Sequence, residues 1–532
     1  MLSQAVMWQN MVMVRLWSHG ILAAALAMLA GVMPAGEALA APRLERERCT
    51  FKPPRGDRVE CHVLIVPENR ELPRGREVRL KVAVLKAKRT ASLEPVVYLS
   101  GGPGDAPLVA STPGADALAE GDWWNETANI RRRRDVIILS QRGAGGTTPN
   151  LDCFDPRTSE PAKAPRRAVT EQQERDILVS CRALLERRKV DLTMYTTPAL
   201  ADDVADLATA FSLSRINLYG VSYGTRWALE VMRRHPGLVR SAVLDGVYPP
   251  QVNGEQNESE IVRRTFLQLY ADCAADAVCR ERHPAIRTMI EGAIESAERA
   301  PLQLTLQLED GARPARLDGA KLLLVLLRMM RDGEAALVPE AVAAIARDDL
   351  RLLRMFAEDL ESNDGGLLEQ GTQQFDGLYN SIECRETWSA VDRAARRRQI
   401  EASGLYGLSA RFSKSPVFCQ LWRVPAAPAA ERQPVKSEIP TLLLSGGYDW
   451  LTPPAWGREA AKTLSSARHV VFRSQGHGVV VQDSCAGRLR DGFIDDPKPK
   501  RAPPCRVSTP PNFTAAYERA RNLPRYDKEK SE

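Results

Sequence analysis

The chain has 532 residues, of which 44% are hydrophobic and 26% charged, an ordinary balance for a soluble globular protein. This length suits one large domain with an insertion, or two to four small domains. The formal net charge of +6 is spread along the chain, and its densest run, residues 131–134, directly precedes an apolar strand. Because no nucleic-acid-binding motif accompanies this run, we expect no nucleic-acid partner.

Residues 1–40 are typical of an export signal. Arg15 precedes an apolar run over 21–33, and Ala38-Leu39-Ala40 supplies small residues for cleavage after Ala40. The apolar run is short for a membrane span and is followed by Pro34, so an uncleaved anchor is the weaker alternative. We therefore predict a secreted or periplasmic protein with no stable membrane span after cleavage.

Ten cysteines follow this segment and none lies within it. An even number of cysteines in an exported chain predicts disulfides, although the sequence does not determine which cysteines pair. Pairing of sequential neighbours is one possibility: Cys49/Cys61, Cys153/Cys181, Cys273/Cys279, Cys384/Cys419 and Cys485/Cys505. A metal site is the competing interpretation. It lacks support because the sequence has no Cys-x-x-Cys or Cys/His cluster, and we predict no metal and no cofactor.

Apolar strands alternate with amphipathic helices over residues 41–251, the first part of a predicted catalytic core. The predicted strands are 63–66, 78–85, 96–99, 136–139, 216–219 and 242–244. A helix is predicted over 198–211, with Thr197 as its cap and apolar residues along one face. This alternation predicts an α/β fold with a mostly parallel central sheet covered by helices on both faces.

The pattern becomes helical over residues 252–435, which we predict to form a cap inserted over the active site. The expected helices are 261–275, 284–299, 319–331 and 339–360. Strand signals return at 442–444 and 470–472, so residues 436–532 are predicted to complete the core and to end in a surface tail.

The segment Gly220-Val221-Ser222-Tyr223-Gly224 lies between a predicted strand and a helical run over 226–234. Gly-x-Ser-x-Gly in a strand–turn–helix context is typical of a nucleophile elbow. The sharp turn lifts the serine hydroxyl clear of the backbone, and small flanking residues are needed because that turn is crowded. Ser222 is therefore the predicted nucleophile.

Two further polar residues follow late strands of the sheet. Asp449 comes after strand 442–444, and His477 lies in a glycine-flanked loop after strand 470–472. The carboxyl ends of parallel strands meet at one edge, and the order Ser, Asp, His is that of α/β-hydrolases. We predict His477 as the base and Asp449 as the residue that orients it. A surface histidine and an ordinary turn aspartate are the alternatives.

Acyl transfer also needs two N–H groups that face the developing oxyanion. Gly101-Gly102-Pro103-Gly104 directly follows strand 96–99, and glycines allow close approach of the backbone. The predicted donors are the backbone N–H groups of Gly102 and Tyr223, the residue after the nucleophile. A glycine–proline turn without catalytic meaning is the alternative.

Together these motifs resemble the proline iminopeptidase/tripeptidyl aminopeptidase family of α/β-hydrolase serine exopeptidases, in its exported, disulfide-containing branch with a TAP-like C-terminal region. The matching segments are 101–104, Gln141-Arg142-Gly143, 195–197, Asp202-Asp203, 220–225, 244–247, Asp449, Thr452-Pro453 and 476–478. Two departures weaken a specific assignment as a proline iminopeptidase: Ser100 stands where many members have His, and Ser140 replaces the usual Asp.

The resemblance implies an aminopeptidase that removes amino acids or short peptides, of tripeptidyl or prolyl type, from free N-termini through an acyl-enzyme on Ser222. Its partners would be peptides with a free N-terminus. A carboxylate in the cap must then bind the α-ammonium group. Glu386 is the first candidate and Glu383 the second, and two solvated helix glutamates are the alternative. The rival functions are a carboxylester hydrolase on the same scaffold and a non-catalytic binding protein.

Overall fold

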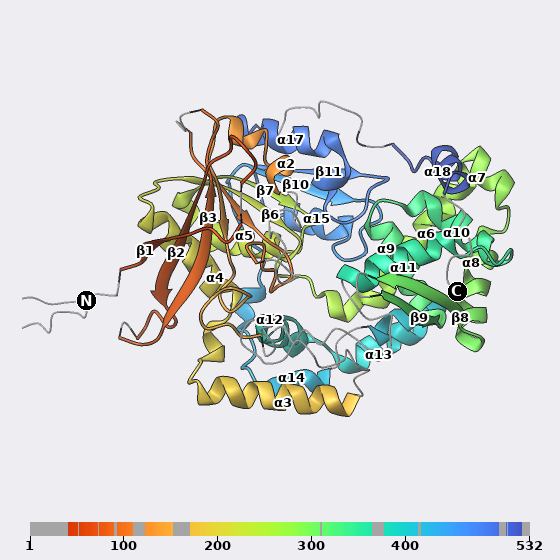
Figure 1. Cartoon of the computed structure of the whole chain (residues 1–532), viewed down its shortest axis with the longest axis horizontal. Helices are drawn as coiled ribbons and strands as arrows, with labels where there is room; N and C mark the ends of the chain where they lie inside the picture. The colour runs from red at the N-terminus through yellow and green to blue at the C-terminus, as the bar shows by residue number, and fades with distance from the viewer. Residues whose placement is uncertain are drawn as a thin grey trace, which may run out of the picture.

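A computed structural model describes residues 41–51, 53–72, 74–89, 93–109, 123–152, 171–308, 311–363, 377–412, 416–498, 507 and 509–523 (Figure 1). The predicted signal segment, residues 1–40, lies outside these ranges. Within them, no helix combines the length and the apolar character that crossing a membrane requires.

A nine-stranded sheet forms the centre of the fold, with the strand order β1-β2-β3-β5-β4-β6-β7-β10-β11. Its strands are β1 (Arg43–Glu47), β2 (Val59–Pro67), β3 (Glu77–Leu85), β4 (Val96–Leu99), β5 (Val136–Leu139), β6 (Ile216–Val221), β7 (Val239–Asp245), β10 (Thr441–Gly446) and β11 (Ala467–Phe472). Strands β1, β2, β3 and β5 pair antiparallel in that order, whereas all pairs from β5 to β11 are parallel. The predicted mostly parallel sheet is therefore confirmed.

Both faces of this sheet are covered, which explains why its central strands are continuous apolar runs. Val97 and Leu99 of β4 pack in one hydrophobic cluster with α4 and α5, whereas Val96 and Tyr98 pack in a second cluster with α17. The helices outside the long insertion are α2 (Trp123–Glu126), α3 (Glu171–Arg187), α4 (Thr197–Ala210), α5 (Tyr223–Arg234), α15 (Pro454–Ala461), α16 (Val479–Gln482), α17 (Ser484–Asp495) and α18 (Phe513–Arg521).

Strand β1 is an element that the sequence pattern did not predict. Its alternate charged residues form ion pairs with residues of β3 rather than apolar contacts: Arg43 with Glu77, Glu45 with Arg79 and Glu47 with Lys81. A strand held in this way has no apolar periodicity, so hydrophobic patterning does not reveal it.

A long, mainly helical insertion connects β7 to β10, and in Figure 1 most of its helices lie to the right of the sheet. Its elements are α6 (Gly254–Ala275), α7 (Ala277–Arg282), α8 (Ile286–Arg299), β8 (Leu302–Leu308), β9 (Gly311–Leu317), α9 (Gly319–Arg331), α10 (Val338–Ile345), α11 (Arg351–Asn363), α12 (Gly377–Ile382), α13 (Arg393–Ala402) and α14 (Pro416–Trp422). The short helical turns of the chain are η1 (Ile130–Arg132), η2 (Leu192–Met194), η3 (Pro236–Leu238), η4 (Ala335–Leu337), the π-helical η5 (Glu383–Thr387), η6 (Trp388–Ala390), η7 (Gly404–Arg411) and η8 (Ala429–Arg432).

The insertion differs from its predicted elements in several ways: α6 begins at Gly254 rather than at 261, and the helices α7, α12, α13 and α14 were not predicted. The helix expected over 339–360 is two helices, α10 and α11, and Asp348 between them has a φ of +53° that a continuous right-handed helix excludes. Strands β8 and β9 form an antiparallel hairpin that was not predicted. Its first strand, Leu-Gln-Leu-Thr-Leu-Gln-Leu, alternates apolar and polar residues, so its period of two was a readable strand signal.

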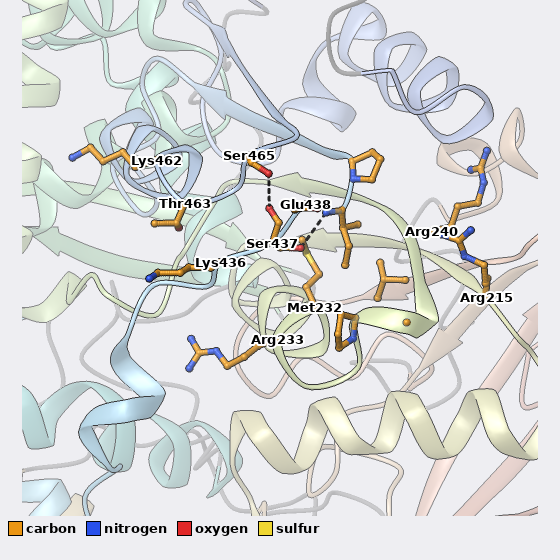
Figure 2. A pocket seen from close by; sticks show the side chains of 15 residues that line it. Arg215, Met232, Arg233, Arg240, Lys436, Ser437, Glu438, Lys462, Thr463 and Ser465 are labelled. Atoms are coloured by element: carbon orange, nitrogen blue, oxygen red, sulfur yellow. Dashed lines mark hydrogen bonds between the residues drawn. The ribbon is translucent and has the colours of Figure 1, made fainter.

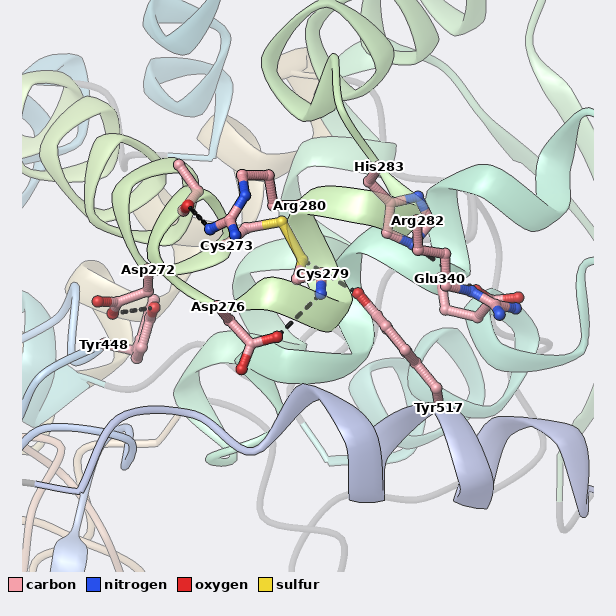
Figure 3. Close-up of a disulfide and its surroundings, with 11 residues drawn as sticks. Asp272, Cys273, Asp276, Cys279, Arg280, Arg282, His283, Glu340, Tyr448 and Tyr517 are labelled. Atoms are coloured by element: carbon pink, nitrogen blue, oxygen red, sulfur yellow. Dashed lines mark hydrogen bonds and ion pairs between the residues drawn. A yellow bond between two sulfur atoms is a disulfide. The ribbon is translucent and has the colours of Figure 1, made fainter.

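Three described disulfides join sequential cysteines: Cys49–Cys61, Cys273–Cys279 and Cys384–Cys419. Cys181 and Cys485 are disulfide-bonded as well, and Cys153 and Cys505 lie outside the described residues. Figure 3 shows that the Cys273–Cys279 bond joins the end of α6 to α7. There the Tyr517 hydroxyl of α18 donates to Cys279 Sγ at 3.1 Å, which docks the last described helix on the insertion.

Candidate active site

Ser222 stands at the turn between β6 and α5, as the strand–turn–helix pattern predicts. Its φ is +57°, uncommon for a residue other than glycine, and its N–H donates to the carbonyl of Asp245 at 2.9 Å. The turn is crowded, since a Cβ on Gly224 would overlap the carbonyl of Leu99. Gly224, two residues after the serine, is therefore needed for the close approach of α5 to β4.

His477 and Asp449 form a direct hydrogen bond, between Nδ1 of the histidine and Oδ2 of the aspartate, at 2.8 Å. Asp449 is buried and accepts three further bonds. These come from the backbone N–H groups of Leu451 and Thr452, at 3.0 and 2.8 Å, and from the Thr452 hydroxyl at 2.6 Å. With all four donors in place, the carboxylate is fixed as an acceptor for one ring nitrogen of His477.

The end of β7 lies between Ser222 and His477. The Asp245 carbonyl binds the Ser222 N–H, and a methyl group placed on Gly246 would stand 3.0 Å from Cε1 of His477. The carboxyl of Asp245 accepts from the N–H groups of Val479 and Val480, each at 3.0 Å, directly after the histidine loop. Burial raises the pKa of this carboxyl to about 6. Asp245 thus joins the serine turn to the histidine loop.

The Gly101–Gly104 loop lies against the nucleophile turn, because a methyl group on Gly101 would stand 3.1 Å from Cβ of Ser222. The buried Gln141 side chain holds this loop by hydrogen bonds. Its Nε2 donates to Ser100 Oγ at 3.0 Å and to the Gly101 carbonyl at 2.7 Å, and its Oε1 accepts from the Gly104 N–H at 3.0 Å. Tyr223 follows Ser222 as the first residue of α5, and Gly102 is next in the chain to Gly101, whose Cβ position lies against Ser222.

The residue after Gln141 is held by a buried ion pair. Arg142 Nε and Nη2 donate to the two carboxylate oxygens of Asp203 at 2.7 and 2.6 Å, and both side chains are fully buried. Such a two-point pair fixes orientation as well as distance. It ties the turn after β5 to helix α4 and so supports the position of Gln141.

Glu383 and Glu386 lie in the π-helical turn η5 and are both buried, 6% and 5% exposed, so they are not solvated helix glutamates. Glu386 accepts from the N–H and the hydroxyl of Thr197 at 2.9 and 2.7 Å, and its Oε2 is 3.7 Å from Nε of Arg226. The same Thr197 hydroxyl is 2.7 Å from the hydroxyl of Tyr223. Both glutamates therefore belong to a polar cluster next to the nucleophile turn, and Glu386 is engaged by structural partners.

Glu383 influences the aromatic side chains of this cluster through its charge. Burial, followed by the charge of Glu383, raises the pKa of Tyr248 to about 12. The guanidinium of Arg226 stacks over the Tyr248 ring, 4.6 Å from its centroid. Two carboxylates and one guanidinium therefore share a buried region on the insertion side of the nucleophile turn.

A cavity of about 880 Å³ lies at the other edge of the sheet (Figure 2). Arg215 precedes β6, Val239 begins β7 and Ile439 precedes β10, so this cavity faces the amino ends of the strands whose carboxyl ends carry the predicted site. It is separate from the candidate active site.

The structure thus places Ser222, the Gly101–Gly104 loop and the His477–Asp449 pair at the carboxyl ends of the strands, and Glu386 of the insertion bonds to Thr197 beside them. Sequence reasoning missed the supporting residues, and for two of them a signal existed. Asp245 ends a buried strand, the same feature that marked Ser222, and Gln141 lies in one of the matched motifs. Nothing in the run Val479-Val480-Val481-Gln482 sets Gln482 apart, although its side chain bonds to the histidine loop.

Comparison with known proteins agrees with this architecture. Residues 94–275 match the family described as alpha/beta hydrolase fold, and residues 406–505 match the family described as TAP-like protein. The chain is 28% identical over 201 residues to the tripeptidyl aminopeptidase of Streptomyces coelicolor, covering 36% of each chain, so the match spans about a third of that relative. It is 22% identical over 466 residues to the serine protease Hip1 of Mycobacterium tuberculosis, covering 82% of this chain and 84% of the relative. A solved proline iminopeptidase from Mycobacterium smegmatis aligns over 79% of this chain and 96% of its own, with 17% identity and a TM-score of 0.36.

Proposed function

From the premise that this chain is a serine hydrolase of the α/β-hydrolase fold, related to tripeptidyl aminopeptidase and to the Hip1 serine protease, we propose that it is an exported aminopeptidase. It releases amino acids or short peptides from the free N-termini of peptide substrates. Its active site is the carboxyl edge of the sheet around Ser222.

In the proposed mechanism, His477 takes the proton of the Ser222 hydroxyl as Oγ attacks the carbonyl carbon of the scissile bond. The same imidazole then protonates the leaving amine as the C–N bond breaks. Water, deprotonated by His477, releases the acyl group and restores the serine. The bond of 2.8 Å from His477 to Asp449 supports these roles, because it occupies Nδ1 and so leaves Nε2 for the proton transfers.

The negative oxygen of the tetrahedral intermediate would be bound by the N–H groups of Gly102 and Tyr223. Tyr223 is the first residue of α5, so the positive end of a helix of 12 residues contributes to the same stabilisation. Gln141 fixes the loop that carries Gly102 before the substrate arrives, which avoids reorganisation during the reaction.

The buried carboxylates Glu383 and Glu386 carry the aminopeptidase assignment. With Arg226 they form a cluster of two negative charges and one positive charge, and a burial of this kind is costly unless the excess charge is neutralised. The α-ammonium group of a peptide would supply that neutralising charge. Glu386 is the first candidate for direct contact with the ammonium group and Glu383 the second, because the two bonds from Thr197 use one acceptor position on each Glu386 oxygen, and a carboxylate has about four such positions.

We further propose that residues 252–435 form a cap over the core segments 41–251 and 436–532. The bonds of Thr197 to Glu386 support this proposal, because they join η5 of the insertion to the first turn of α4. Substrate would then bind between the cap and the nucleophile turn.

Peptides that differ only at the N-terminus test this function. We expect cleavage of free tri- and tetrapeptide amides, no cleavage of their N-acetylated forms, and labelling of wild type but not of Ser222→Ala by a fluorophosphonate probe. Equal cleavage of free and acetylated peptides contradicts the aminopeptidase assignment. Hydrolysis of short acyl esters alone identifies a carboxylester hydrolase, and failure of the probe to label the wild type identifies a non-catalytic protein.

The export part of this proposal rests on the disulfides, which form and persist in oxidising compartments. We expect the mature protein, isolated from periplasm or medium, to begin at Ala41. Recovery of the active protein from the cytosol with residues 1–40 still attached contradicts it.

A further inference from the structure

We propose that Gln482 is a positioning residue for His477, and that it does so by fastening the histidine loop to the end of α9 in the insertion. The inference rests on the proposed role of His477 as the base. It assigns to the insertion a second task besides substrate binding, which is to support the acid–base pair.

The Gln482 amide bonds to the backbone on both sides of His477. Its Oε1 accepts from the Gly476 N–H at 2.7 Å, and its Nε2 donates to the His477 carbonyl at 2.7 Å. One side chain thereby holds the peptide group that precedes Gly476 and the peptide group that follows His477. Rotation of the histidine backbone would break one or both of these bonds.

The same amide connects the loop to the insertion. Gln482 Nε2 also donates to the Arg331 carbonyl at 2.8 Å, and the His477 N–H donates to that carbonyl at 2.7 Å. Arg331 is the last residue of α9, and carbonyls at a helix end lack partners within the helix. The histidine loop therefore supplies the donors that the end of α9 needs.

The contact between the loop and α9 is close as well as hydrogen-bonded. A Cβ on Gly476 would overlap the carbonyls of Met330 and Arg331, so any side chain there would push the histidine loop away from the helix. Glycine at this position is required by the approach of the two backbones.

The loop that carries Asp449 is hydrogen-bonded to the same helix, α9. The indole N–H of Trp450 donates to the Leu327 carbonyl of α9 at 3.1 Å, and the hydroxyl of Tyr448 donates to Asp272 Oδ2 of α6 at 2.7 Å. The residues on both sides of Asp449 are thus tied to helices of the insertion. One helix, α9, holds both partners of the His477–Asp449 pair.

Only an amide makes all three bonds of Gln482. In Gln482→Leu the Gly476 N–H and the His477 carbonyl lose their partner, and in Gln482→Glu a carboxylate oxygen faces two carbonyl oxygens. A displacement of about 1 Å at a catalytic group costs about 100-fold in rate. We therefore expect both variants to lower kcat by about 100-fold, with KM for a free tripeptide amide within about twofold of wild type, since the amine site is untouched.

The rate of fluorophosphonate labelling of Ser222 provides a readout that does not depend on the peptidase assignment, because labelling needs the base but not the amine site. It should fall in parallel with kcat in both Gln482 variants. Trp450→Phe, which removes one bond to α9 and keeps the ring, should lower the labelling rate less. Gln475→Leu is the matched control on the same loop, since its amide bonds only to the Ser474 hydroxyl at 3.3 Å among the described residues, and its labelling rate should equal that of wild type.

The inference is overturned if Gln482→Leu labels at the wild-type rate, or if kcat falls only in proportion to the folded fraction measured by circular dichroism. It is also overturned if the labelling rate of Gln475→Leu falls as much as the labelling rate of Gln482→Leu. Should Gln482→Leu not fold, the comparison of Gln482→Glu with the control decides by the same criteria. Failure of the proposed function would look different, as wild-type protein that the probe labels but that leaves free peptides uncleaved.

Discussion

Replacing Asp245 by asparagine tests whether burial or hydrogen bonding controls the carboxyl that links the serine turn to the histidine loop. The two effects oppose each other. Burial disfavours the charged form, whereas the N–H groups of Val479 and Val480 and the charge of a protonated His477 favour it. The nearby carboxylate of Asp449 acts in the same direction as burial. In the structure burial dominates, and it raises the pKa of Asp245 to about 6.

The sign of the effect on stability follows from proton binding. Between the ordinary carboxyl pKa of 3.8 and the folded value of about 6, the folded protein binds more protons at Asp245 than the unfolded chain does. The contribution of Asp245 to the free energy of unfolding therefore decreases as the pH rises through this window. The interval between the two pKa values corresponds to about 3 kcal/mol.

The assay is denaturant unfolding of wild type and Asp245→Asn at several pH values from 4 to 7.5, with the disulfides intact. Asparagine does not titrate and keeps one acceptor oxygen for the Val479 and Val480 N–H groups. The substitution therefore changes the free energy of unfolding by an amount that asparagine itself does not vary with pH. Any change with pH in the difference between the two proteins reports the titration of Asp245. We expect the advantage of wild type over the variant to shrink by about 2.4 kcal/mol between pH 4 and pH 7, most of the full difference. An advantage that grows with pH would refute the reasoning, because it would mean that the two N–H donors outweigh burial.

Three further variants test the proposed site. Asp449→Asn leaves the fold intact and lowers kcat by about 10,000-fold, because the wrong tautomer of His477 is favoured; steady-state kinetics with unchanged Tm checks this. Gln141→Leu releases the Gly102 loop and lowers kcat about 100-fold, comparable to the loss of one oxyanion donor, and a KM that rises while kcat holds would contradict it. Glu383→Gln raises KM for free peptides by about 10- to 100-fold and leaves hydrolysis of short acyl esters unchanged, and an equal loss on both substrates would count against its role in amine binding.

The sequence predicted the sheet, and the strand ends that carry the proposed site, because these depend on periodic features. Buried parallel strands are apolar along their whole length, and the residues that follow them meet at one edge, so Ser222, Asp449 and His477 could be placed from three strand ends. Elements without such a pattern were missed. Strand β1 is held by charged pairs, and the division of 339–360 into α10 and α11 depends on the conformation of Asp348.

The supporting residues were beyond sequence reasoning for a different reason. A hydrogen-bonded glutamine such as the buried Gln141 or the half-buried Gln482 has no pattern that distinguishes it from a surface glutamine, because its role depends on which backbone groups the fold leaves without partners. Those groups belong to segments far away in the chain, such as Arg331 for Gln482. The consequence for the proposed function is that the His477–Asp449 pair is held from two sides, by the core through Asp245 and by the insertion through α9. A substitution in α9 that moves the Arg331 carbonyl should therefore reduce the rate without contact to substrate.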